Sequence, residues 1–140
     1  MKVTLLGAGP WGTAMAVQAA RQLRAEDVCL WSRNVEQLQA IAKSGENHSY
    51  LPGIRLPKNL LLQSDFDAAV KRLGSEDLLV IATPVSGLSD TIARALEVAQ
   101  HPLNIIWLCK GLEPATALLP HQLVERQNQL HGRGLKHAFG

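Results

Sequence analysis

The sequence predicts an α/β fold, in which a doubly wound, mainly parallel sheet carries helices on both faces. Three observations indicate this fold. Strand-like and helix-like segments alternate, several strand-like segments are uninterrupted apolar runs, and a glycine-rich turn joins the first strand to the first helix. Such alternation builds parallel sheets, whose strands are buried on both faces. The 140 residues suit one domain, so we expect a single domain over residues 1–140.

The first half of the chain supplies three short strands and three helices. The predicted strands lie at 2–6, 28–31 and 60–62, and the predicted helices at 11–23, 35–43 and 65–73. Met15, Ala19 and Leu23 have the spacing that places them on one face of the first helix. Gly45 and Gly74 lie just past the other two helices, where glycine commonly follows a helix end.

The second half continues the alternation. Apolar runs predict strands at 78–82 and 104–109, helices are predicted at 86–99 and 116–130, and residues 133–140 begin a further strand. Pro120 interrupts the first turns of the last helix.

One connection is unusually long. Residues 45–59 are mostly polar and include two prolines, which predicts a long loop of the kind that is often functional or mobile. Its apolar residues Tyr50 and Leu51 either anchor the loop on this domain or pack against something outside this chain.

The turn after the first strand has the sequence Gly7-Ala8-Gly9-Pro10-Trp11-Gly12. In a Rossmann-type fold the first glycine of such a turn allows a sharp bend, the second lets a pyrophosphate approach the backbone, and the third lets the helix pack on the strand. The helix N-terminus then offers free N–H groups and the positive end of its dipole to phosphate oxygens. A dinucleotide-binding site at Gly7, Gly9, Pro10, Trp11 and Gly12 is therefore predicted, with a structural turn as the alternative.

Trp31-Ser32-Arg33 ends the second strand, where a dinucleotide fold contacts the adenosine ribose. An acidic residue there would favour NAD, but here Arg33 can pair with a 2′-phosphate while Ser32 donates a hydrogen bond. We therefore expect NADP(H) to bind at least as well as NAD(H). The alternative is that Arg33 is an ordinary solvated arginine.

Two further segments follow strands and so face the same crevice. Thr83 is expected to cap a helix that starts with Pro84, with a backbone contact to the cofactor as a less certain addition. Lys110 can hold a substrate oxygen or phosphate, and Gly111 allows close approach; by spacing alone Lys110 is as well explained as a surface lysine.

Composition excludes several other classes. The net charge of +2 and the lack of an aromatic-rich basic stretch do not indicate nucleic-acid binding. Cys29 and Cys109 lie in apolar runs and predict buried, reduced thiols, without a disulfide framework or a metal site. No segment has the roughly 20 apolar residues of a membrane span and no signal peptide is recognisable, so a cytoplasmic location is expected.

Together these motifs resemble the N-terminal domain of the bacterial NAD(P)-dependent glycerol-3-phosphate dehydrogenases. The matching segments, in the order of the family, are 7–14, 31–33, 47–53, 56–57 and 109–113. The resemblance implies an oxidoreductase that reduces dihydroxyacetone phosphate to sn-glycerol 3-phosphate, the precursor of the phospholipid backbone. It places Trp11 and Arg33 at the cofactor, Lys110 between cofactor and substrate, and Gly140 in a substrate-contacting segment.

Two departures from the family qualify this expectation. Pro10 stands where family members usually carry serine, which removes one N–H that could reach a phosphate. Family members also continue into a helical C-terminal domain with the general acid/base lysine, so no catalytic residue is expected in this chain. We expect the chain to bind NADPH with little or no turnover, and its uncovered face to permit a homodimer.

Three other hypotheses remain at this stage. A reductase for another carbonyl substrate fits the glycine turn and Arg33, but not the segments 50–53 and 109–113. A non-catalytic module that senses nucleotides is compatible with the missing domain. A purely structural domain with an empty crevice is a third possibility.

Overall fold

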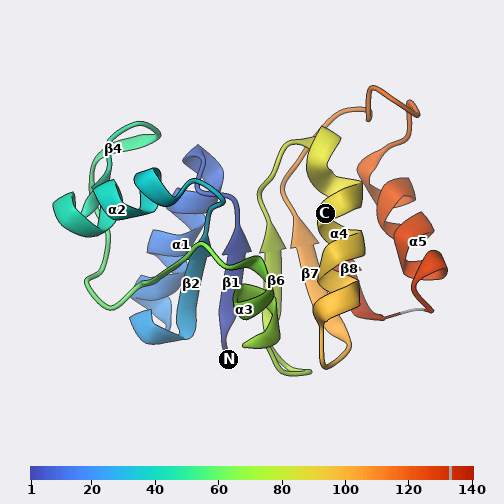
Figure 1. Cartoon of the computed structure of the whole chain (residues 1–140), viewed down its shortest axis with the longest axis horizontal. Coiled ribbons are helices and arrows are strands. Elements are labelled where there is room, and N and C mark those ends of the chain that lie inside the picture. Colours follow the sequence, from blue (N-terminus) through green and yellow to red (C-terminus); the bar gives the residue numbers. More distant parts are fainter. Residues whose placement is uncertain (133) are drawn as a thin grey trace.

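The computed structural model describes residues 1–132 and 134–140, so Arg133, where the last expected strand began, lies outside the description. Its main sheet has six strands in the order β5-β2-β1-β6-β7-β8, and every neighbouring pair in that sheet is parallel. The predicted α/β fold with a parallel sheet is confirmed. Helices flank the sheet, with α1 and α2 at one end of Figure 1 and α4 and α5 at the other.

The elements follow the predicted alternation, with ends that differ by a few residues. The six strands of the main sheet are β1 (Val3–Leu6), β2 (Val28–Trp31), β5 (Leu61–Gln63), β6 (Leu78–Ile81), β7 (Leu103–Trp107) and β8 (Leu135–Phe139). The α-helices are α1 (Pro10–Gln22), α2 (Val35–Ser44), α3 (Phe66–Lys71), α4 (Val85–Val98) and α5 (Pro120–Leu130), and one 3-10 turn spans Ala25–Asp27.

Local sequence explains how these helices start and stop. The Asn34 side chain accepts from the Gln37 N–H at 3.0 Å at the start of α2, and Gly45 ends that helix with a φ of 77°. Helix α5 begins at Pro120 and not at residue 116, so the predicted start was too early. Proline lacks an N–H and fits the first helical turn, where none is needed, so it opens this helix and does not interrupt it.

The long connection predicted at 45–59 was wrong as an irregular loop, because it contains a second, two-stranded sheet. Strands β3 (Glu46–Asn47) and β4 (Leu51–Arg55) pair antiparallel. Two-residue and proline-containing strands leave no period-two pattern to recognise. Leu51 packs against the core beside α1, so the hairpin is anchored on this domain, whereas Tyr50 remains half exposed.

The sheet separates two hydrophobic cores. On one face, Leu5 and Val80 pack with Val17 of α1 and Ile41 of α2. On the other face, the neighbouring strand residues pack against α3, α4 and α5, through a cluster that includes Leu6, Leu79, Phe66, Leu88, Ile92 and Leu123. Because successive strand residues point to opposite faces, continuous apolar strands supply both cores. None of the helices in the described residues is long and apolar enough to cross a membrane.

Asp77 connects backbone segments at the amino ends of β1 and β6, opposite the carboxyl ends of the strands. Its carboxylate accepts from the backbone N–H groups of Lys2 and Gly74, both at 2.7 Å. Burial alone would raise the pKa of this carboxyl, but the two N–H donors outweigh it and hold the pKa below the ordinary 3.8.

We expect Asp77→Ala to lower the free energy of unfolding at pH 7 by about 1–3 kcal/mol, because two backbone N–H groups lose their charged acceptor. The native carboxyl has a lower pKa than the unfolded one, so its contribution is complete above about pH 4 and is lost as the pH falls further. Urea unfolding at pH 7 and pH 3 measures both effects. Asp90→Ala, on the exposed surface of α4, is the matched control, and an equal loss for both variants would contradict the assignment.

Candidate functional site

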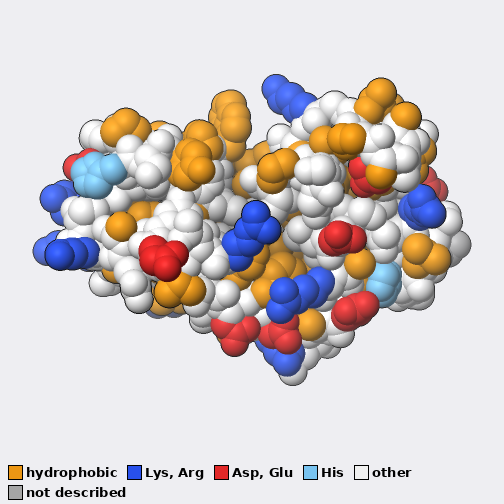
Figure 2. All heavy atoms as spheres, turned by 45° about the horizontal axis from the view of Figure 1, so that its top comes forward, with side chains coloured by type: hydrophobic (Ala, Val, Ile, Leu, Met, Phe, Trp, Pro, Cys, Tyr) orange, Lys and Arg blue, Asp and Glu red, His pale blue; other side chains and the backbone are white. Residues whose placement is uncertain are grey.

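A cleft of about 940 Å³ opens at the carboxyl ends of β1, β2, β6 and β7. Strand order reverses direction between β1 and β6, and such switch points are where open parallel sheets bind ligands. Figure 2 shows this side of the molecule hollowed between two lobes, with hydrophobic side chains around the rim. Trp11 and Tyr50 line the cleft; Trp11 is largely exposed and Tyr50 half exposed.

The glycine turn forms the floor of the cleft. Gly7 has a φ of 116°, and a Cβ on it would lie 2.9 Å from the Ala82 carbonyl oxygen. A Cβ on Gly12 would overlap the Gly7 carbonyl oxygen, so this glycine sets the contact between α1 and β1 and does not itself line the cleft. A Cβ on Gly9 would meet nothing within 4 Å, so the space above this backbone is open. The three glycines therefore bend the chain, leave room above it, and bring helix and strand together.

Two helix N-termini point at the cleft. Helix α1 starts with Pro10 after the N-cap Gly9, and helix α4 starts after the N-cap Pro84. Neither first turn carries an acidic residue, and no side chain caps either helix. Their positive dipole ends and free N–H groups are thus available to an anion.

The charged side chains of the cleft are both cations. Arg33 and Lys110 line it, and no Asp or Glu does so among the residues that the structure describes. The other lining residues are neutral, including the polar side chains Ser32, Asn34, Gln37, Ser86 and Thr91, so the site is electrostatically suited to an anionic ligand.

Ser32 has a different contact from the one expected. Its hydroxyl is buried, donates to Gln37 Oε1 at 2.9 Å and accepts from the Asn34 N–H at 3.1 Å. The expectation that Ser32 donates to a ribose phosphate is at odds with this network, because its only proton is directed at Gln37. Arg33 is therefore the polar side chain of this pair that is open to a ligand.

Thr83 also differs from its expected role. Helix α4 has Pro84 as its N-cap, one residue later than predicted, and the Thr83 hydroxyl does not cap it. Pro84 itself is in the extended N-cap conformation, with a ψ of 155°, so the capping position falls on a residue without a polar side chain. Its Oγ1 is buried without a hydrogen-bond partner in the described residues, and Thr83 lines the cleft. An unpartnered buried hydroxyl at a cleft indicates a ligand that completes its hydrogen bonding.

Of Cys109 and Gly140, only Cys109 reaches the cleft. Cys109 lines the cleft, and burial raises the pKa of its thiol, so it stays protonated and is not a nucleophile at neutral pH. Gly140 follows β8 and lies against the Trp107 ring, outside the residues that line the cleft. The structure thus brings together all the predicted cofactor residues except the packing residue Gly12, but does not bring Gly140 to them.

Two residues that were not predicted as site residues, Gln37 and Asn47, donate hydrogen bonds to the backbone of the glycine turn. Gln37 Nε2 donates to the Ala8 carbonyl at 2.9 Å, and Asn47 Nδ2 donates to the same oxygen at 3.0 Å. Asn47 is 1% exposed and also donates to Thr13 Oγ1 at 2.8 Å. The burial of Asn47 could not be predicted from the sequence, because Asn47 lies in a polar segment and its partners are 34 and 39 positions away.

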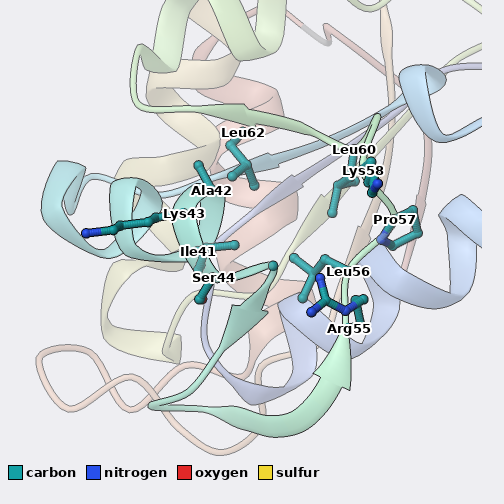
Figure 3. A pocket seen from close by; sticks show the side chains of 11 residues that line it. Ile41, Ala42, Lys43, Ser44, Arg55, Leu56, Pro57, Lys58, Leu60 and Leu62 are labelled. Carbon is teal, nitrogen blue, oxygen red and sulfur yellow. The ribbon is translucent and has the colours of Figure 1, made fainter.

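A second, smaller cavity of about 330 Å³ lies between α2 and the segment from β4 to β5 (Figure 3). Its wall combines the aliphatic side chains of Ile41, Leu56 and Leu60 with the cations Arg55 and Lys58, while the Lys43 side chain points away from it (Figure 3). The C-terminal end of α2 lies here, and its dipole disfavours an anion. This cavity has cations, but its described lining includes neither the glycine turn nor a helix N-terminus of the kind found at the cleft.

The cleft fits a phosphate-containing dinucleotide on four counts. It has sufficient volume, two open helix N-termini, two cations with no carboxylate among the described lining residues, and a buried hydroxyl with no partner in the described part of the chain. The described residues contain no group of three or more His, Cys, Asp or Glu side chains placed to bind a metal.

Comparison with known proteins agrees with this geometry. Residues 2–132 match the sequence model of the family described as NAD-dependent glycerol-3-phosphate dehydrogenase N-terminus. The chain is 68% identical to the glycerol-3-phosphate dehydrogenase [NAD(P)+] of Polynucleobacter necessarius and 45% identical to that of Cupriavidus necator. Each match includes the whole chain but only 41% of the length of the relative.

Solved structures give the same result. The glycerol-3-phosphate dehydrogenase of Coxiella burnetii superposes with a TM-score of 0.77 at 28% identity, over 90% of this chain and 37% of that one. The yeast glycerol-3-phosphate dehydrogenase superposes with a TM-score of 0.74 over 100% of this chain and 40% of that one, at 24% identity, which shows the shared fold.

Proposed function

We propose, from the premise that this chain belongs to the NAD-dependent glycerol-3-phosphate dehydrogenase family, that it holds NADP(H), and also NAD(H), for the interconversion of dihydroxyacetone phosphate and sn-glycerol 3-phosphate. The observation that carries the proposal is the cleft at the glycine turn, with two cations, two helix N-termini and no carboxylate among its described lining residues.

Each part of the cleft has a distinct task in this proposal. The turn from Gly7 to Gly12 and the start of α1 bind the pyrophosphate, while Arg33 pairs with a ribose 2′-phosphate. Thr83 gives its unpartnered hydroxyl to the cofactor, and Pro84 shapes the wall beside it. Because Pro10 has no N–H, fewer donors than usual are available at the turn.

Lys110 is proposed to hold the substrate. It follows β7 at the carboxyl edge of the sheet and lines the same cleft as the glycine turn. The nicotinamide, when bound, supplies or accepts the hydride, and an ammonium beside it attracts the phosphate or carbonyl oxygen of the substrate. A substrate contact at Gly140 remains a prediction from resemblance, because the structure leaves this residue outside the cleft.

The chain spans about 41% of the length of the relatives that it matches. We propose that residues 1–140 are the cofactor domain, and that a further domain supplies the proton donor and additional substrate contacts. The exposed Trp11 and Tyr50 at the rim would then meet that domain or, in its absence, a second copy of this chain. The free thiols of Cys29 and Cys109 suit the reducing cytoplasm, where synthesis of phospholipid precursors would place the enzyme.

Titration of the chain with NADPH and NADH by calorimetry tests the proposal. We expect both to bind, NADPH at least as tightly, and we expect NADPH oxidation with dihydroxyacetone phosphate to stay far below that of an intact relative. Failure to bind either dinucleotide would favour a purely structural domain. Tight binding that dihydroxyacetone phosphate never affects, together with a protein partner, would favour a nucleotide sensor.

A further inference from the structure

The peptide between Ala8 and Gly9 is held by two side-chain amides from outside the glycine turn. Gln37 reaches it from α2 and Asn47 from the β3–β4 hairpin, at 2.9 and 3.0 Å from the Ala8 carbonyl oxygen. Both lone pairs of that oxygen are therefore occupied, which restricts rotation of the peptide plane.

The orientation of this peptide decides what the cleft can bind. A trans peptide is planar, and its C=O and N–H point in opposite directions. With the Ala8 oxygen turned toward α2 and the hairpin, the Gly9 N–H points to the other side, and it has no acceptor among the described residues. Since Gly9 lines the cleft and Pro10 has no N–H, the Gly9 N–H is one of few donors for a pyrophosphate.

Both amides are themselves held in place. Gln37 Oε1 accepts from Ser32, whose neighbour Arg33 lines the ribose end of the cleft, and Asn47 also donates to Thr13 in the first turns of α1. Asn47 is almost completely buried, and its contacts join the hairpin directly to the turn. These bonds fix the direction of each amide, whereas the amide of a surface side chain would rotate freely.

We infer that Asn47 and Gln37 are positioning residues for cofactor binding, which hold the Ala8–Gly9 peptide so that the Gly9 N–H meets the pyrophosphate. The inference rests on the proposed function. It gives the hairpin a role in the site although, of its residues, only Tyr50 reaches the lining. It also links the ribose-binding segment to the pyrophosphate-binding turn through Gln37.

The test compares Asn47→Asp and Gln37→Leu, which remove the two donors with little change in size. Each is expected to weaken NADPH binding on the order of tenfold, the effect of one lost hydrogen bond to a charged group. Binding of adenosine 2′-monophosphate, which has no pyrophosphate, should change less than twofold in Asn47→Asp. Calorimetry gives the NADPH affinity, and NMR shifts give that of the mononucleotide.

Matched controls separate positioning from stability. Asn59→Asp and Gln39→Leu make the same changes at exposed positions, and both should bind NADPH as the parent does. Melting curves fix a temperature at which all variants are folded. Gln37 is only half buried, so its variant keeps the test available if Asn47→Asp does not fold.

Folded variants that bind NADPH as tightly as the parent would overturn the inference, as would an equal loss for the mononucleotide in Asn47→Asp. If the parent chain itself bound no dinucleotide, the proposed function would fail, which is a separate outcome. A tenfold loss confined to the pyrophosphate-containing ligand supports positioning.

Discussion

Replacing Arg33 by aspartate is expected to shift the ratio of NADPH to NADH affinity by about 100-fold in favour of NADH. Arg33 is exposed, lines the ribose end of the cleft and has no carboxylate near it among the described lining residues. Its guanidinium can therefore pair with a 2′-phosphate in two hydrogen bonds. Aspartate removes that pair, repels the phosphate, and accepts from the 2′-hydroxyl of NADH, so all three changes act in the same direction.

Calorimetric titration of both cofactors measures the ratio. Arg55→Asp makes the same charge change at the smaller cavity between α2 and β4, away from the glycine turn, and should leave the ratio unchanged. Equal ratios in Arg33→Asp and in the parent chain would show that Arg33 is solvated and does not read the ribose. Because both cofactors share the pyrophosphate, the ratio cancels any general damage to the turn.

The sequence was sufficient for the main sheet and its helices because the evidence for them is local, whereas the β3–β4 hairpin was missed. Uninterrupted apolar runs predict β6 and β7 as buried parallel strands. Gly45 predicts the end of α2, because glycine readily adopts the left-handed conformation that ends many helices. The cofactor cleft follows from the same evidence, since parallel strands carry every residue after their carboxyl ends to one edge of the sheet. Gly9, Arg33 and Lys110 therefore meet there, although 101 positions separate the first from the last.

The hydrogen bonds of Ser32 and Asn47 could not be predicted, because they join atoms that only the folded chain brings together. Ser32 was expected to face a phosphate, but Gln37 is one helical turn further along and takes its proton. Asn47 lies in a polar loop, and only the antiparallel pairing of β3 with β4 turns its amide under the glycine turn. Side-chain hydrogen bonds of this kind have no periodic pattern, so neither spacing nor propensity could predict them.

Alanine substitutions at two glycines of the turn should have different effects: Gly12→Ala should lower stability, and Gly9→Ala should lower NADPH affinity. Gly12→Ala places a Cβ on the Gly7 carbonyl oxygen and 3.2 Å from the Ala82 Cβ. The Gly7 backbone cannot yield without separating α1 from β1, so we expect a loss of about 3 kcal/mol or more in the free energy of unfolding. Thermal and urea unfolding measure this loss.

Gly9→Ala should leave stability almost unchanged, because a Cβ there meets nothing within 4 Å and the φ of −78° is ordinary for any residue. The same Cβ would occupy the space through which a pyrophosphate approaches the backbone, so NADPH affinity should fall on the order of 10- to 100-fold. A Gly9→Ala variant that unfolds like Gly12→Ala, or that binds NADPH like the parent, would contradict this division. Gly12 would then be required for the packing of α1 on β1, and Gly9 for the approach of the ligand. An activity assay alone could not separate the two, because both substitutions would lower activity.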